Sequence, residues 1–303
     1  MLLHVGYHKT ATTWLQRQVF CDGSGSFGVP CQGLDQIDQL IRPHPLEWDE
    51  AATAEYFRPR VAEIEAKGLV PVLSNEEFSG NPHSGSYQSL ENARRLHRIF
   101  PEAKVLIVIR RQVDQILSSY KQYVSRGGAL SPIRYFERPR EYFRVPGFRF
   151  GHFEFDRLIQ VYVDLFGKDR VMVLPYEWMV QDRDAFLGRI YAFCGADPVA
   201  DVNDGRERLS LSGSTIMLQR RLNRHFLRDD VNQSATFSFP SMPYYLRRID
   251  GVLSKVFGTR CDDILRKHVE DRCRGRYVQS NLRTKAITGL PLDDLGYEVA
   301  SSG

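Results

Sequence analysis

Four short apolar segments constrain the fold of this 303-residue chain more than any other feature of its sequence. Each segment is rich in leucine, isoleucine or valine, and three of them end in polar or glycine residues. Continuous apolar segments of this length are typical of strands that are buried on both faces of a sheet. The four expected strands are residues 2–6, 69–74, 104–110 and 170–174.

Stretches with helical periodicity lie between the expected strands, and this alternation indicates a parallel sheet with helices on both faces. We therefore expect an α/β fold, in which a central, mostly parallel β-sheet is flanked by helices as a three-layer sandwich. We expect one domain over residues 1–303, with a helix-rich C-terminal part from residue 203 onward. The clearest helical segments are residues 12–20, 51–67, 89–100, 152–166, 214–227 and 262–278.

Residues 125–150 follow neither pattern, because they are rich in arginine, proline, glycine and aromatic residues and lack periodicity. Long irregular segments inside compact domains are often functional. We interpret this segment as a lid or acceptor loop, and the alternative is a surface excursion without a role. Its aromatic residues would line an acceptor pocket or simply pack internally; they are Tyr135, Phe136, Tyr142 and Phe143.

The type of basic residue in this chain says more about its function than the net charge does. A formal net charge of +4 is too small to indicate nucleic-acid binding by itself. Only eight of the 41 basic residues are lysines, and the planar fork of arginine suits phosphate and sulfate groups. No apolar stretch is long enough to span a membrane.

Cysteine usage and the N-terminus bear on the compartment. The five cysteines are widely spread and form no CxxC pair, so we expect neither a disulfide framework nor a zinc site. The N-terminal residues lack the basic and apolar regions of a secretory signal, and we expect a cytoplasmic protein. Since HExxH and EF-hand motifs are also absent, we expect no metal requirement.

The segment from Gly6 to Thr13 follows the first expected strand and opens a helix. A strand-to-helix loop directs free N–H groups toward one point at the positive end of the helix dipole. Lys9 adds a mobile positive charge, and the threonines add hydroxyl donors. The segment predicts an anion-binding cradle that differs from the GxxxxGK[ST] phosphate loop. The alternative is a capped helix start with an incidental lysine.

The run Gly-Tyr-His-Lys-Thr-Ala-Thr-Thr-Trp-Leu at residues 6–15 resembles the 5′-phosphosulfate-binding loop of sulfotransferases. These enzymes use 3′-phosphoadenosine 5′-phosphosulfate (PAPS) and have a P-loop-like fold. Ala11 stands where the family usually has glycine, and alanine restricts φ. The resemblance implies that PAPS is the co-substrate and that it is bound by Lys9, Thr10, Ala11, Thr12 and Thr13.

A second anchor follows the third expected strand. In the family an arginine ends this strand, a serine follows eight residues later, and both hold the 3′-phosphate of PAPS. The corresponding residues are Arg110 and Ser118, and their neighbours Arg111 and Ser119 are one-step alternatives. Guanidinium and hydroxyl donors at a strand end and in the next helix can converge on one dianion. The Asn-Pro pair that commonly follows the arginine is replaced here by Arg111 and Gln112.

Sulfuryl transfer to an alcohol requires a base that removes the hydroxyl proton and a positive charge on the leaving oxygen. Lys9 can supply that charge. Residues 74–78, Ser-Asn-Glu-Glu-Phe, resemble the place where many bacterial members carry a carboxylate, and Glu76 is the expected base. Glu77 and His8 are the alternatives, because geometry decides such roles before pKa does.

Weaker resemblances extend toward the C-terminus. They include the residues around Tyr176 and Glu177, residues 277–281 and the pair Gly296-Tyr297. Arg206 and Arg208 are candidates to close over the nucleotide from the C-terminal side.

These features predict a bacterial-type, PAPS-dependent sulfotransferase without a metal. Its partner would be a hydroxyl or amine of a carbohydrate, lipid or small-molecule acceptor, and the sequence does not predict the oligomeric state. Two alternatives stay open: a P-loop-like ATP-dependent kinase, and a nucleotide-binding module without catalytic activity.

Overall fold

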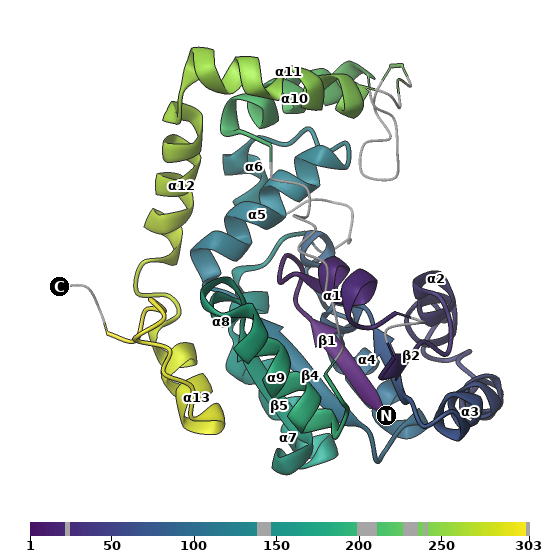
Figure 1. Ribbon diagram of the computed structural model, residues 1–303. Helices are drawn as coiled ribbons and strands as arrows, with labels where there is room; N and C mark the ends of the chain where they lie inside the picture. The colour runs from purple at the N-terminus through teal and green to yellow at the C-terminus, as the bar shows by residue number, and fades with distance from the viewer. Residues whose placement is uncertain are drawn as a thin grey trace.

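The computed structural model describes residues 1–21, 25–137, 147–198, 211–226, 236–237, 239 and 242–300. Its centre is a five-stranded, wholly parallel sheet in the order β2-β3-β1-β4-β5 (Figure 1). The α/β expectation is therefore confirmed, and all four predicted strands are present. The strands are β1 (Leu2–Gly6), β2 (Phe27–Gly28), β3 (Val70–Ser74), β4 (Lys104–Ile109) and β5 (Val171–Pro175).

Successive strand residues point to opposite faces of the sheet, and each face buries its own set of side chains. On one face, Leu2, Leu106 and Val108 pack against α1 (Thr12–Gln18) and α9 (Arg183–Cys194). On the other face, the neighbouring strand residues belong to a larger core. That core includes α4 (Ser89–Ile99), α5 (Gln112–Ser125) and α7 (Phe155–Phe166).

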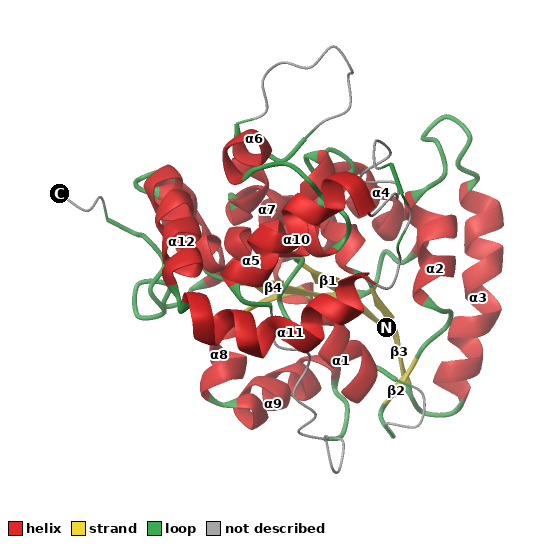
Figure 2. Ribbon diagram, turned by 90° about the horizontal axis from the view of Figure 1, so that it is seen from above, coloured by secondary structure: helices red, strands yellow, loops and turns green. Residues whose placement is uncertain are grey.

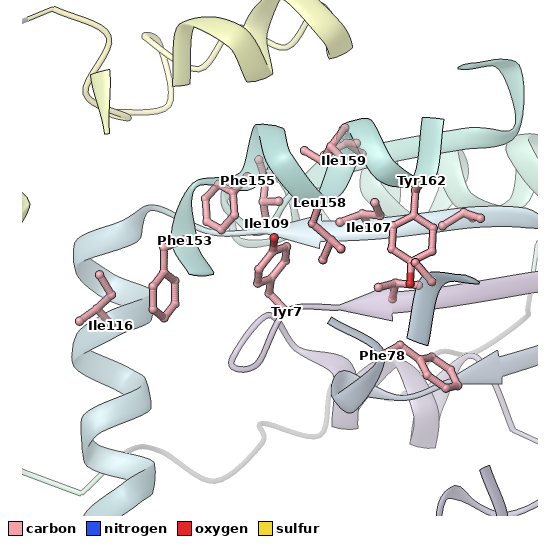
Figure 3. Packing of buried hydrophobic residues seen from close by; sticks show 14 of the residues in the cluster. Tyr7, Phe78, Ile107, Ile109, Ile116, Phe153, Phe155, Leu158, Ile159 and Tyr162 are labelled. Atoms are coloured by element: carbon pink, nitrogen blue, oxygen red, sulfur yellow. The ribbon is translucent and has the colours of Figure 1, made fainter. Parts of the chain in front are cut away.

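Figure 2 shows the three layers, with α1, α8 (Tyr176–Gln181) and α9 on one side of the sheet and α4, α5 and α7 on the other. Figure 3 shows the larger core at close range, where Ile107 and Ile109 of β4 lie beneath Phe155, Leu158 and Ile159 of α7. Tyr7, which begins the loop after β1, lies edge-on against Phe155 of this core.

The remaining described helices extend the layers at both ends. Beside β2 lie the short α2 (Gly33–Gln36) and α3 (Glu50–Ala66), which begins where the Asp49 carboxylate accepts from the N–H of Ala52. In the C-terminal part, α10 packs on both α5 and α12, and α13 packs on α7. These elements are α6 (Pro132–Phe136), α10 (Gly213–Phe226), α11 (Met242–Phe257), α12 (Arg260–Cys273) and α13 (Val278–Thr288).

Three details differ from the sequence expectations. The stretch 262–278 is not one helix, because α12 ends at Cys273 and Gly275 takes a left-handed φ of 68° before α13 begins. The expected loop after residue 125 contains the short α6, while residues 138–146 lie outside the described residues. The edge strand β2 was not predicted, since two residues give no periodicity to detect. None of the described helices is both long and apolar enough to cross a membrane.

Candidate active site

The connection from β1 to α1 is the most strained backbone of the described chain near the sheet. Lys9 and Ala11 both adopt left-handed φ values, 69° and 63°. This region costs a residue with a Cβ roughly 1–2 kcal/mol. Ala11, at the N-cap of α1, thus takes a conformation that favours glycine. Strain of this kind persists where the surrounding structure fixes it and is common at functional sites.

The same connection contains hydrogen-bond donors that have no acceptor among the described residues. None of the described side chains caps the N-terminus of α1, so its first N–H groups remain available at the positive end of the helix dipole. The Thr12 hydroxyl is buried and has no hydrogen-bond partner among the described residues. Thr10 instead donates to the carbonyl of Tyr7 at 2.5 Å, and Thr13 is exposed. A Cβ on Gly6 would lie 2.4 Å from Thr12 Oγ1, so the loop requires glycine there.

Arg110 lies directly after β4 and reaches this loop. Its Nη1 donates to the backbone carbonyl of Lys9 at 3.1 Å, and its guanidinium lies 4.8 Å from the centre of the Tyr176 ring. The contact follows from the topology, because β1 and β4 are parallel neighbours whose carboxyl ends share one edge. Arg110 and Tyr176 also line a cavity of about 610 Å³ between α5 and α8.

The neighbouring residues in the second anchor have other partners. Arg111 forms an ion pair with Asp114 at 2.7 Å, and its backbone N–H donates to Glu177 at 3.0 Å. Ser119 is fully buried and donates to the carbonyl of Gln115 in its own helix at 2.8 Å. Ser118, one position before Ser119 in α5, is half-buried.

The C-terminal segment closes against this corner of the sheet. The Tyr297 hydroxyl donates to Glu177 at 3.0 Å, and a Cβ on Gly296 would lie 3.3 Å from Arg111 Nη1. The landmarks near residues 176 and 296, 120 residues apart in the case of Glu177 and Tyr297, therefore meet beside Arg111.

The three base candidates form one cluster. After β3, the 3-10 turn Glu76–Ser79 is tied to β1 by the Ser79 hydroxyl, which donates to the Gly6 carbonyl at 3.3 Å. This places both carboxylates beside His8. Its Nδ1 lies 3.3 Å from Glu76 Oε1, and its Nε2 lies 3.7 Å from Glu77 Oε1.

The two carboxylates differ in their surroundings. Burial alone would raise the pKa of Glu76, but the close His8 ring and the charges of Arg126 and Lys9 outweigh it and lower the pKa to about 2. Glu76 is therefore ionised at neutral pH. Glu77 instead accepts a hydrogen bond from the Asn81 amide at 3.0 Å, which holds its carboxylate in place.

Solvent access separates the candidates further. The side chains of Glu76 and Glu77 are 26% and 25% exposed, whereas that of His8 is 4% exposed. An incoming hydroxyl can therefore reach the carboxylates more readily than the imidazole.

Two further histidines lie close enough to His8 to feel its charge. Burial, with the charge of His8 as a smaller cause, lowers the pKa of both His83 and His152 to about 3. Both rings are therefore neutral at neutral pH. His83 Nδ1 is 2.7 Å from the Tyr135 hydroxyl, and the His152 ring lies 4.9 Å from the Tyr7 ring.

Sequence reasoning gave no role to three residues of this edge, although it named Tyr176 as a landmark. Gln115 is fully buried and its amide donates to the His8 carbonyl at 2.8 Å. The positive charge of Arg126, at the end of α5, helps to lower the pKa of Glu76. Tyr176 lies against Arg110. Only Tyr176 had a sequence signal, its place at the end of a predicted strand; a buried glutamine within a helix and an arginine at its end carry none.

Other predicted residues lie elsewhere. Arg206, Arg208, Tyr142 and Phe143 are outside the described residues. Tyr135 and Phe136 are buried in an aromatic cluster with Tyr120 and Phe148. Within the described ranges, no group of three or more His, Cys, Asp or Glu side chains is arranged to hold a metal ion.

Comparison with known proteins gives one match at the level of a family. The sequence model described as the Sulfotransferase family matches residues 3–201. A search of curated proteins finds no significant match.

Several solved structures are similar to this chain at low identity. A sulfotransferase from Alicyclobacillus acidocaldarius is 20% identical, with 68% of this chain and 85% of that chain covered and a TM-score of 0.47. The sulfotransferase domain from the curacin biosynthetic pathway is 10% identical, with coverages of 84% and 89% and a TM-score of 0.42. Mouse sulfotransferase SULT7A1 complexed with PAP is 15% identical, with coverages of 89% and 88% and a TM-score of 0.31.

Proposed function

Because this chain belongs to the sulfotransferase family, we propose that it transfers the sulfuryl group of PAPS to a hydroxyl or amine of a carbohydrate, lipid or small-molecule acceptor. The observation that supports this most directly is the shared edge of the sheet. There the Arg110 guanidinium contacts the Lys9 carbonyl, and the charge of Lys9 is one of the causes that lower the pKa of Glu76.

The loop after β1 is suited to the 5′-phosphosulfate. The N–H groups of the first turn of α1 and the unpartnered Thr12 hydroxyl can donate to anionic oxygens. Lys9 adds a positive charge where the bridging oxygen would leave. Thr10 supports the loop from inside, since its hydroxyl is already bonded to Tyr7.

Arg110 and Ser118 are the better pair for the 3′-phosphate. Arg111 is engaged by two carboxylates and Ser119 by its own helix, whereas the Arg110 guanidinium contacts the loop at the Lys9 carbonyl. The cation–π contact with the Tyr176 ring, 4.8 Å from the guanidinium carbon to the ring centre, helps to hold this planar donor in place.

In the reaction, the acceptor oxygen attacks sulfur while its proton passes to Glu76. The sulfur–oxygen bond to the 5′-phosphate breaks, and its electrons remain on adenosine 3′,5′-bisphosphate. Lys9 stabilises the charge that develops on that oxygen. Glu76 is the group that meets the acceptor because it is ionised and accessible, and the buried His8 behind it orients the carboxylate.

The decisive experiment compares ligands and then measures transfer. Thermal shift should show stabilisation by adenosine 3′,5′-bisphosphate without metal, and radiolabelled sulfate should pass from PAPS to a member of an acceptor panel. Stabilisation by ATP with Mg²⁺ alone would indicate a kinase. Tight bisphosphate binding with no transfer to any sugar, lipid, phenol or amine would indicate a binding module.

A further inference from the structure

The helix pair α10 and α11 carries an unusual share of the charge of this protein. Together the two helices contain six arginine or lysine residues and one aspartate, although the formal net charge of the whole chain is only +4. The rest of the chain is therefore close to neutral. The basic residues are Arg220, Arg221, Arg224, Arg247, Arg248 and Lys255.

The same pair also exposes apolar side chains. The two helices contact each other through Leu218 and Leu222 on α10 and Met242 and Leu246 on α11. Beside this buried seam, α11 leaves a second apolar row in solvent, with Val252 at 62% and Val256 at 69% exposure. The row consists of Tyr245, Ile249, Val252 and Val256, which follow one another at the four- and three-residue spacing of one helix face.

Cations border this apolar row. Arg248 and Lys255 each lie three residues after a member of the row, so they are its neighbours on the helix surface, and both are exposed. Arg248 also lies 5.4 Å from the centre of the Tyr244 ring.

Exposed aromatic rings extend the surface. Phe239 is stacked on Tyr245 with 6.0 Å between ring centroids, and Phe226 is stacked on Phe237 at the same distance. Half of the sixteen large apolar side chains exposed in the described residues lie between Phe226 and Val256. Exposed Phe and Tyr rings beside a basic helix face are typical of helices that lie at the boundary between water and lipid.

We infer that α11 docks the protein on an anionic lipid surface, with its apolar row in the acyl boundary and Arg248 and Lys255 among the headgroups. A basic amphipathic helix of this kind lies in the membrane plane and needs no spanning segment. The charge pattern argues against a second copy of the chain as the occupant. A two-fold contact along α11 would bring Arg248 and Lys255 against the same cations of the partner.

The helix pair α10 and α11 is attached to the part of the molecule that holds the candidate active site. α10 is fixed to the end of α5, where the Asn223 amide donates to the carbonyls of Val124 and Gly128 at 2.7 and 2.9 Å. The other end of α5 begins beside Arg110 at the carboxyl edge of the sheet. A docked α11 therefore lies beyond this edge, and α5 and α10 connect it to the candidate active site (Figure 1).

The test is cosedimentation of the full chain with vesicles. Binding is expected to vesicles of equal parts phosphatidylcholine and phosphatidylglycerol, to be weak on pure phosphatidylcholine, and to fall at high salt. The double variant R248Q/K255Q should bind roughly 25-fold more weakly, since each basic residue near an anionic surface contributes about fivefold. Ile249→Asp with Val252→Asp should reduce binding by at least about tenfold.

Two matched controls use residues on other faces. R58Q/R94Q removes two exposed arginines, and Leu46→Asp removes an apolar side chain that is 90% exposed; both should bind vesicles like the wild type. Thermal unfolding of each variant checks that it is folded. The inference is overturned if the wild-type chain does not bind anionic vesicles or if the α11 variants bind as it does. It is also overturned if ultracentrifugation shows a dimer that Ile249→Asp dissociates while vesicles are not bound.

Discussion

The Arg110 guanidinium donates a hydrogen bond to the backbone carbonyl of Lys9, with 3.1 Å between Nη1 and the oxygen. The two residues are 101 positions apart and come together because β1 and β4 are adjacent parallel strands. A ligand that bound to both of these cationic side chains would carry an anionic group near each end. Adenosine bearing phosphates on its 3′ and 5′ positions has this form.

Replacing Arg110 by alanine should weaken adenosine 3′,5′-bisphosphate binding roughly 10- to 100-fold, because hydrogen bonds to a charged group are lost. Adenosine 5′-monophosphate lacks the 3′-phosphate, so calorimetry should show little effect of the same substitution on its affinity. The control is Arg111→Ala, whose guanidinium is already paired with Asp114. Equal losses for both nucleotides would mean that Arg110 supports the Lys9 loop and does not bind the 3′-phosphate.

Replacing Lys9 by alanine should lower kcat by about 100-fold or more, while bisphosphate affinity changes much less. At the left-handed φ of 69°, alanine has about the same conformational cost as lysine, so the substitution should not change the backbone conformation of the loop. Lys67→Ala, at an exposed lysine paired with Glu63, is the matched control. Turnover of Lys9→Ala at the wild-type rate would rule out the proposed role at the leaving oxygen.

Replacing Glu76 by glutamine should reduce kcat by roughly 10²- to 10⁴-fold, as expected for loss of a general base. Glu77→Gln should cost less than about tenfold, because that carboxylate is held by Asn81 and is farther from the His8 ring. Steady-state kinetics of the two variants, which differ by one position in the chain, separates the assignments. A larger loss for Glu77→Gln would move the base to Glu77.

The dependence of kcat/KM on pH tests the proposed interaction between Glu76 and His8 independently. Because the pKa of Glu76 is lowered to about 2, its protonation should limit kcat/KM of the wild type only in strong acid. His8→Asn removes the ring that opposes the effect of burial, so the acid limb should move up by about one pH unit or more. An acid limb in the same place in both proteins would show that His8 does not set the ionisation of the base.

The sequence predicted the strands well because they depend on local patterns. The apolar segments of β1, β3, β4 and β5 are buried on both faces, which leaves a continuous signal. The contacts that complete the site depend on distance in the fold. The Gln115 amide on the His8 carbonyl joins residues 107 positions apart, and no local pattern encodes it.

The choice between adjacent candidates also needed the structure. Spacing favoured Arg110 and kept Arg111 as an alternative, and the different partners of the two arginines are seen only once α8 and the C-terminal segment are in place. The break between α12 and α13 was missed because the apolar periodicity continues across Gly275.

The buried histidine of β1 predicts how stability depends on pH. Burial lowers the pKa of His4 to about 3, so the unfolded chain binds a proton below about pH 6.5 that the folded chain does not. The free energy of unfolding should therefore fall by about 2 kcal/mol between about pH 7 and pH 5 on account of this ring.

Denaturant unfolding at the two pH values tests this prediction. In His4→Phe the difference between them should shrink by that amount, even though the variant loses the contact with Ser74 Oγ and is less stable at both. His44→Phe, at an exposed position, should leave the difference unchanged. An unaltered pH dependence in His4→Phe would mean that this ring is not the titrating group.

Ala11 predicts a stabilising substitution within the cradle itself. Its φ of 63° is costly for any residue with a Cβ, so Ala11→Gly should raise the free energy of unfolding by about 0.5–1 kcal/mol after the extra chain entropy of glycine is counted. The matched control is Ala62→Gly on the exposed face of α3, where glycine in a right-handed helix should cost about 0.5–1 kcal/mol. Chemical denaturation measures both changes, and opposite signs are expected. Destabilisation of Ala11→Gly to the same extent as the control would show that the loop is not held in the left-handed conformation in solution.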